Sequence, residues 1–163
     1  THPTNTSPRY LREVLRPRLE KGATHRASDL APLRLMVGCR IATGRTDADV
    51  ERERENARRS LAFLYSTPAY WSSLEIFGWE DRGPALRKLT REQQWDRMPE
   101  LVDDKMLDAF VPSATYENVS GLLEQWYGDL TDTITFPMPE DPRDDEACRQ
   151  VVAALRRGSP HNA

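Results

Sequence analysis

A run of alternating apolar residues over positions 33–43 constrains the fold more than any other segment of the chain. The side chains that share one face of this run are Leu33, Leu35, Val37, Cys39 and Ile41. Met36 and Gly38 fall on the opposite face. Apolar residues on both faces are typical of a strand in a parallel sheet that is covered on both sides. We therefore predict a buried strand over residues 33–43, which needs neighbouring strands and covering helices.

A helix is predicted before this strand. Ser7 followed by Pro8 is an N-cap with proline at the first helical position, and apolar residues then recur at helical spacing. The pattern predicts a helix from Pro8 to Lys21. Pro17 lies inside it and is expected to kink it, because proline lacks the backbone N–H.

Further helices are predicted after the strand. Thr46 and Asp49, three residues apart, form a capping-box pattern. The pattern predicts a long helix that continues to about Leu64, with charged residues over most of its surface. Caps, prolines and glycines then recur at short intervals over residues 65–106, which predicts a series of short helices.

A second apolar run, Thr131–Phe136, predicts the last strand, and an amphipathic helix follows it. The order helix, strand, long helical crossover, strand and helix is typical of parallel α/β units. We therefore assign the chain to the α/β class. Two or three strands leave both edges of a sheet open, so we expect the remaining strands to lie outside this chain.

The composition agrees with a core that extends beyond the chain. Only 38% of the residues are hydrophobic, whereas 30% are charged. Such proportions limit the apolar area that the residues can bury among themselves. The chain also begins with Thr1 rather than Met, and its first eight residues resemble the middle of a loop, so we expect it to be cut from a longer polypeptide.

The charge pattern and the apolar runs exclude two kinds of partner. The formal net charge is −3, and Lys and Arg are interspersed with Asp and Glu, so no broad basic surface is available for a nucleic acid. No apolar run approaches the roughly 20 residues that cross a bilayer, and the first residues lack the features of a secretory signal. We expect a soluble, cytoplasmic protein without a membrane partner.

The sequence contains no pattern of a metal or nucleophile site. His2, His25 and His161 lie far apart in polar segments, so no metal site is expected. Neither a nucleophile elbow nor a glycine-rich phosphate loop occurs. Cys39 and Cys148 fall in the predicted strand and in the last helix, where each is expected to be a buried thiol.

Several short motifs, in their order and spacing, resemble one enzyme family. They are Ile41-Ala42-Thr43-Gly44, Arg59-Ser60-Leu61-Ala62-Phe63, Ser66-Thr67-Pro68-Ala69-Tyr70, Gly78-Trp79, Trp95-Asp96-Arg97-Met98, Asp103-Asp104, Leu107-Asp108-Ala109-Phe110 and Tyr127-Gly128-Asp129-Leu130. Together they resemble a branch of the luciferase-like flavin and deazaflavin oxidoreductases, over nearly all of the chain from Arg9 to Pro137. The sequence departs from that pattern at residues 111–115, which replace a glycine-containing turn.

The resemblance implies a fold, and it implies which part of that fold is present. Members of the family are eight-stranded β/α (TIM) barrels, which need roughly 250 residues or more. This chain is similar to the C-terminal part only. Residues 33–43 would be the seventh strand and residues 131–136 the eighth, with residues 65–106 as a helical insertion between them. The barrel part would cover residues 1–157, and residues 158–163 are expected to form a flexible tail.

The resemblance also implies hydride transfer at the C-terminal mouth of the barrel. The cofactor would be coenzyme F-420, a deazaflavin, or alternatively flavin mononucleotide (FMN). Earlier strands hold the cofactor ring, so no catalytic or cofactor-binding residue carries over to this chain, and we do not expect the chain alone to contain the cofactor site. Residues that could reach the mouth form a candidate pocket for a small-molecule substrate, namely Thr43, Arg45, Tyr65 and Tyr70.

Each candidate also has a plainer interpretation. Arg45 could meet an anionic substrate, or it could be a solvated residue beside a helix start. Tyr65, Tyr70 and Trp71 could line an apolar pocket, or they could pack against the core at helical spacing. The pair Asp103-Asp104 could supply a general acid or base, or could serve in a turn or cap.

Two functions from different classes therefore stay open. The chain is the C-terminal part of a luciferase-like, F-420-dependent oxidoreductase, and its partner is the missing N-terminal half of the barrel. Alternatively, it is a non-catalytic remnant or helical interaction protein, which forms a homo-oligomer through its exposed sheet edge. Cofactor binding distinguishes the two.

Overall fold

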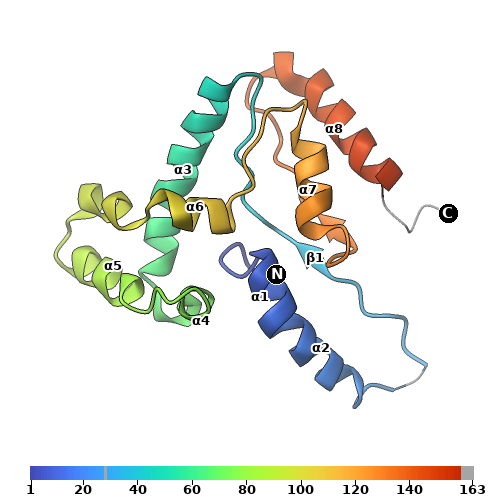
Figure 1. Ribbon diagram of the computed structural model, residues 1–163, viewed down its shortest axis with the longest axis horizontal. Coiled ribbons are helices and arrows are strands. Elements are labelled where there is room, and N and C mark those ends of the chain that lie inside the picture. The colour runs from blue at the N-terminus through green and yellow to red at the C-terminus, as the bar shows by residue number, and fades with distance from the viewer. Residues whose placement is uncertain (28, 159–163) are drawn as a thin grey trace.

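The computed structural model describes residues 1–27 and 29–158, and Figure 1 shows a helix-rich α/β arrangement. Its helices are α1 (Pro8–Tyr10), α2 (Arg16–Ala23), α3 (Asp47–Tyr65), α4 (Ser72–Glu75), α5 (Arg82–Arg91), α6 (Asp104–Phe110), α7 (Val119–Tyr127) and α8 (Asp145–Gly158). Shorter helical elements are the π-helical turn η1 (Leu11–Leu15) and the 3-10 helices η2 (Pro68–Tyr70), η3 (Trp95–Leu101) and η4 (Pro142–Asp144). The strands are β1 (Met36–Val37) and β2 (Thr133–Ile134). None of the described helices is long and apolar enough to cross a membrane.

The two strands lie side by side and run parallel. Met36 pairs with Thr133, and Val37 pairs with Ile134. The prediction of two parallel neighbouring strands is therefore confirmed. Their predicted lengths, residues 33–43 and 131–136, are wrong, because only two residues of each form the ladder. A strand extends only as far as a neighbour bonds to it, and alternation in one sequence does not indicate where that neighbour ends.

The predicted cover on both faces of the first strand is only partial. Val37 is fully buried and Cys39 is buried, whereas Leu33 and Met36 are each 55% exposed. The inner face at Val37 packs on the core of the chain itself. The side chain of Met36 points away from that core, so the described residues leave the opposite face open.

A third extended segment lies beside the continuation of β1. The backbone N–H of Ala42 donates to the carbonyl of Pro112 (3.0 Å), and the N–H of Ala114 donates to the carbonyl of Ala42 (3.1 Å). These bonds form a parallel bridge between Ala42 and Ser113. We call residues 35–43 the central segment. β2 hydrogen-bonds to Leu35 and Val37 of this segment, whereas the bridge uses Ala42. Backbone groups of odd- and even-numbered residues point to opposite edges of an extended segment, so β2 and the bridge lie on opposite sides of it. The sequence did not predict this third segment.

The helix predicted over Pro8–Lys21 is confirmed and continues to Ala23, as α1, η1 and α2. The Ser7 hydroxyl accepts a hydrogen bond from the N–H of Tyr10 (3.2 Å), which makes Ser7 the predicted N-cap. The distortion expected at Pro17 takes the form of the π-helical turn η1 just before it. Proline offers no N–H to the carbonyl four residues earlier, and the wider turn accommodates that loss.

The helices predicted after the strand are also confirmed. The Thr46 hydroxyl accepts from the N–H of Asp49 (3.2 Å), and the Asp49 carboxylate accepts from the N–H of Thr46 (3.1 Å), as a capping box requires. α3 ends at Tyr65, one residue beyond the expected end. The elements η2, α4, α5 and η3 give the predicted helical character to residues 65–106. Gly158 ends α8, and the remainder of the tail predicted at 158–163 lies outside the described residues.

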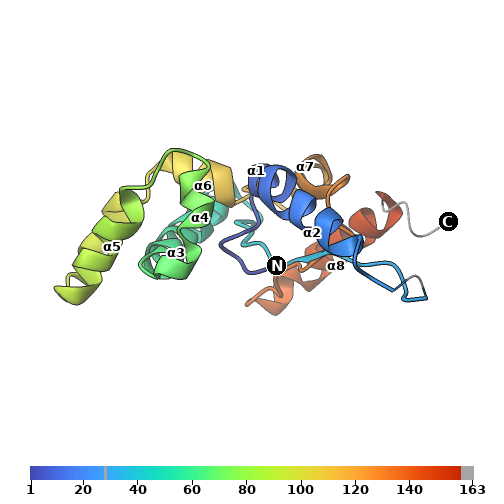
Figure 2. The ribbon, with the colours of Figure 1, turned by 90° about the horizontal axis from the view of Figure 1, so that it is seen from below.

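Two clusters of buried apolar residues hold these elements together. Figure 2 shows the helices in two groups, with α3 to α6 on one side and α1, α2, α7 and α8 on the other. The first cluster includes Leu61, Tyr65, Leu74, Leu86, Met106, Leu107 and Phe110. The second includes Leu11, Val37, Val119, Leu123, Tyr127 and Val151. The central segment joins the two groups, because Ala42 belongs to the first cluster and Val37 to the second.

Candidate functional site

The candidate site begins where the central segment leads into α3. Thr43 is 7% exposed, and its hydroxyl has no hydrogen-bond partner among the described residues. Gly44 follows at a close approach, because a Cβ atom there would lie 2.3 Å from the Cβ of Asp49. Only glycine fits this position without a shift of the first turn of α3. The segment therefore presents one buried, unpartnered hydroxyl beside a tightly packed helix start.

Arg45 is bound by the C-terminal part of the chain. Its guanidinium donates to the carboxylate of Asp144 and to the carbonyl of Arg143. The same carboxylate accepts from the Tyr116 hydroxyl at 3.5 Å. The Arg45 side chain is still 52% exposed, but its charge is compensated within the chain. An anionic substrate would have to displace Asp144 to reach it.

Carboxylates occupy the N-terminus of α3. Hydrogen bonds from Thr46, together with a bond and an ion pair from Arg52, hold the pKa of the Asp49 carboxyl below its ordinary value. Asp47 lies in the same first turn. The partial positive charge of a helix N-terminus attracts anions, and here the side chains of the helix itself satisfy it.

Tyr65 and Trp71 pack against the core. Tyr65 is fully buried, and its hydroxyl donates to the carbonyl of Thr4 (3.1 Å). The Tyr65 hydroxyl also accepts a hydrogen bond from the Ser73 hydroxyl (3.4 Å). Burial raises the pKa of the Tyr65 hydroxyl above its ordinary value. The Trp71 indole N–H donates to the Tyr65 carbonyl (2.8 Å). These contacts agree with the packing interpretation of both aromatic residues.

The four predicted pocket residues do not converge. Tyr70 is partly buried and stacks on the His2 ring, with ring centroids 4.4 Å apart. It lies with Tyr65 at the C-terminal end of α3, whereas Thr43 and Arg45 lie at the N-terminal end. A helix of 19 residues is about 28 Å long, so the two pairs are far apart. A role in substrate binding stays a prediction for each of them.

The acidic pair Asp103-Asp104 has structural partners. The Asp103 carboxylate accepts from the backbone N–H of Met106 (3.0 Å) and so caps α6. The Asp104 carboxylate pairs with the guanidinium of Arg58 (2.6 Å). These contacts agree with the cap interpretation rather than with a general acid or base.

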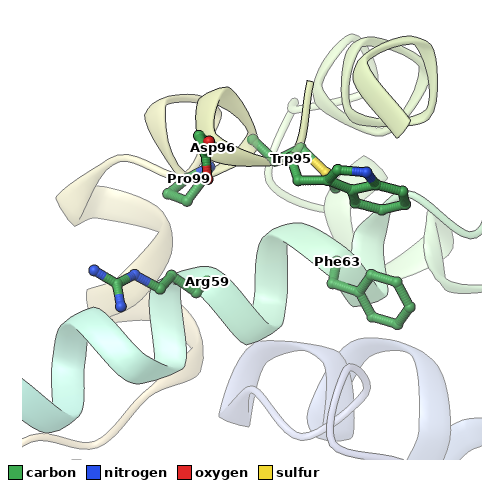
Figure 3. Close-up of a pocket in the computed structure, with 6 residues that line it drawn as sticks. Arg59, Phe63, Trp95, Asp96 and Pro99 are labelled. Carbon is green, nitrogen blue, oxygen red and sulfur yellow. The ribbon is translucent and has the colours of Figure 1, made fainter. Parts of the chain in front are cut away.

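Two grooves lie away from the predicted site. A groove of about 600 Å³ runs between α3 and η3, and Figure 3 shows its lining residues. They are Arg59, Phe63, Trp95, Asp96, Met98 and Pro99. A second groove of about 630 Å³ lies between α7, β2 and α8, and it includes Tyr127, Phe136 and Leu155. Neither groove includes a residue of the predicted pocket.

One residue of the sequence faintly indicates the groove between α3 and η3. Phe63 is a large apolar residue on a helix face that is otherwise charged. Trp95 lies 32 positions further on, so no local pattern connects the two side chains. Only the packing of η3 against α3 brings them together.

Metal or thiol chemistry has no support in this part of the chain. The described residues contain no group of three or more His, Cys, Asp or Glu that could hold a metal ion. Cys39 and Cys148 are both buried and free. Burial raises the pKa of the Cys39 thiol to about 11, so the thiol stays protonated and unreactive near neutral pH.

Comparison with known proteins identifies the family. A family model for luciferase-like monooxygenases matches residues 1–133. The chain belongs to the luciferase-like monooxygenase family. Similar relatives are uncharacterized proteins of Mycobacterium bovis and of two strains of Mycobacterium tuberculosis, each 36% identical over 122 residues. The match covers 75% of this chain but 36% of each relative, so the chain spans about a third of the length of the curated relatives it matches.

Family membership explains the architecture. Membership of this family implies a β/α barrel. The two parallel strands and the many helices of the chain agree with part of such a barrel. The expected family and the expected α/β class with parallel strands are confirmed, and the barrel is the fold that the family implies.

The described residues do not fit the phosphate group that both flavin and deazaflavin cofactors of luciferase-like proteins carry. The Thr43 hydroxyl is one unpartnered donor at the end of the central segment. However, the Asp49 carboxylate fills the N-terminus of α3, and Asp144 neutralises Arg45. With the N-terminus of α3 filled by its own carboxylate and the charge of Arg45 compensated, neither of these two positive groups is free to hold an anion.

Proposed function

We propose that this chain forms the C-terminal section of a luciferase-like barrel oxidoreductase, which transfers hydride with coenzyme F-420, or alternatively with FMN. The observation that carries this proposal is the parallel pairing of β1 with β2 in a chain that matches 36% of its relatives. Eight such strands make a barrel, so the other strands would come from the remainder of the protein.

Within this proposal, the cofactor is held by residues outside the chain. The filled N-terminus of α3 and the compensated charge of Arg45 support that assignment. The chain would complete the barrel wall and supply part of a pocket for a small-molecule substrate. Thr43 is the residue best suited to contact that substrate, because its hydroxyl is buried and unpartnered.

A non-catalytic role is the second candidate, and one observation favours it. The described residues offer no open anion site at the N-terminus of α3 or at Arg45, because Asp49 and Asp144 already occupy these groups. In this case the chain would serve as an interaction protein and would bind neither cofactor, even within a complete barrel.

Cofactor titration distinguishes the two functions. The purified chain would be mixed with F-420 and separately with FMN, and cofactor fluorescence would be followed. A chimera would carry this chain's residues 1–133 in place of the matching segment of a mycobacterial relative, with the unmodified relative as the control. We expect no binding by the chain alone and equal binding by the chimera and the relative.

Two outcomes contradict the proposal. Binding by the chain alone would place the cofactor site within the described residues. A chimera with the circular dichroism of the relative but without its cofactor binding would favour the non-catalytic role.

A further inference from the structure

The groove between α3 and η3 exposes two large aromatic side chains. Phe63 is 58% exposed and Trp95 is 47% exposed, and their ring centroids lie 6.4 Å apart. Neighbouring exposed aromatic rings are typical of surfaces that another molecule covers, because water around them costs free energy.

Two unpartnered charges accompany the aromatic rings. The other arginines of α3 form ion pairs, Arg52 with Asp49, Arg54 with Asp108 and Arg58 with Asp104. Arg59 and Asp96 line the groove, and neither forms an ion pair with any residue in the described ranges. The groove therefore offers one positive and one negative group, both available to another molecule.

The two walls of the groove present matching residues in the same order. Arg59 and Phe63 lie one turn apart on α3, and Asp96 and Trp95 lie on η3. In Figure 3, Arg59 lies on α3 across from Asp96 and Pro99, and Phe63 lies on α3 across from Trp95. Each wall thus carries one charge and one aromatic ring, and the charges of the two walls are opposite.

We propose that this groove is the interface of a homodimer. A twofold axis along the groove places the α3 wall of one copy against the η3 wall of the other. Arg59 of each copy then faces the partner's Asp96, and Phe63 faces the partner's Trp95. A surface that is complementary to itself in this way suits an isologous contact, in which each pairing occurs twice.

The charges favour a second copy over a small ligand. An anionic ligand would pair with Arg59 and leave Asp96 exposed, and a cationic ligand would do the reverse. A second copy satisfies both groups at once and covers the aromatic rings as the apolar centre of the interface. This interface does not depend on hydride transfer or on cofactor binding.

The test begins with the oligomeric state of the full chain. Sedimentation equilibrium from micromolar to millimolar protein should show a monomer and dimer in exchange. Phe63→Ser and Trp95→Ser should each weaken the dimer by about tenfold or more, because each removes a central ring from both halves. Met36→Ser is the matched control, since Met36 is as exposed as Phe63 but lies on the open face of β1.

A charge exchange tests the pairing itself. Arg59→Glu and Asp96→Arg should each weaken self-association by about tenfold, because like charges then face one another twice. A mixture of the two variants should form a heterodimer as tight as the wild-type dimer, because one original Arg59–Asp96 pair is kept and the two substituted positions form the second pair with its signs exchanged. Folding defects cannot produce this rescue.

Three results would overturn the proposal. A wild-type chain that stays monomeric at all concentrations would leave the groove to a different occupant. A dimer that persists in Phe63→Ser but dissociates in Met36→Ser would move the interface to the sheet. Failure of the two charge variants to associate when mixed would exclude the Arg59 and Asp96 pairing.

Discussion

Two buried hydroxyl groups in this chain have opposite surroundings. The Tyr65 hydroxyl donates to the carbonyl of Thr4 and accepts from Ser73, so its polar atoms are satisfied. The Thr43 hydroxyl is buried without a partner among the described residues. A buried polar group without a hydrogen bond opposes folding unless water or another molecule satisfies it.

Removal of these hydroxyls should therefore have opposite effects. Tyr65→Phe should lower the free energy of unfolding by about 1–2 kcal/mol, because it leaves the buried Thr4 carbonyl unsatisfied. Thr43→Val keeps the side-chain shape and should be neutral or raise stability by up to about 1 kcal/mol. Urea unfolding followed by circular dichroism measures both. A loss of stability in Thr43→Val would show that its hydroxyl is bonded in the folded chain.

At the scale of elements, the start of α3 depends on ionised Asp49. Its carboxylate bonds to the N–H and hydroxyl of Thr46 and to Arg52. These contacts lower the pKa of Asp49 in the folded chain, so the ionised group stabilises the fold above its ordinary pKa of 3.8. This stabilisation disappears as the pH falls through the lowered value.

Asp49→Asn should consequently show a pH-dependent defect. At neutral pH the variant should unfold at a lower urea concentration than the wild type. The difference should shrink as the pH falls below 3.8, where the wild-type carboxyl becomes protonated. Asp47→Asn is the control, because it removes a charge from the same turn but none of the cap bonds. Equal pH dependence in both variants would contradict the assignment to the cap.

Comparison of the elements shows which of them the sequence predicts. α3 was predicted to within one residue because its start depends on Thr46 and Asp49, which are close in sequence. β1 was predicted in the right place but too long, because its partner lies about a hundred residues away. The bridge at Ser113 was missed, since it consists of a single residue pair between distant segments.

In the candidate site, too, the features set by residues close in sequence were predicted and those set by distant residues were not. Thr43 and Arg45 could be placed at a strand end from local patterns, but the contact of Arg45 with Asp144 spans 99 positions and could not. Tyr65 and Tyr70 were predicted near the same pocket, and the length of α3 separates them from Thr43. Contacts between distant segments determine these arrangements, and the local patterns of a single sequence do not reveal such contacts.

At the scale of the whole molecule, two hydrophobic clusters share one central segment. The helices α3 to α6 pack on the first cluster, and α7 and α8 pack on the second. The bridge between Ala42 and Ser113 and the bond from Tyr65 to Thr4 are among the contacts that connect the two groups. The two clusters have no buried residue in common, so we expect local opening of one cluster without opening of the other.

Leu86→Ala should reveal this division. Leu86 is fully buried in the first cluster, and its truncation should cost about 2–5 kcal/mol. Hydrogen exchange should accelerate in α3, α5 and α6 while the amides of α7 and α8 keep their protection. Val151→Ala, in the second cluster, is the matched control and should give the reverse pattern. Equal acceleration in both groups would show that the chain unfolds as one cooperative unit.

The unequal exposure of the four tryptophans has a practical consequence. Trp95 is 47% exposed, whereas Trp71, Trp79 and Trp126 are partly buried. A collisional quencher such as acrylamide meets the Trp95 indole most readily, so this residue dominates the quenchable part of the intrinsic emission. The chain thereby carries a built-in optical reporter beside Phe63, one that senses whatever occupies that surface without any added dye.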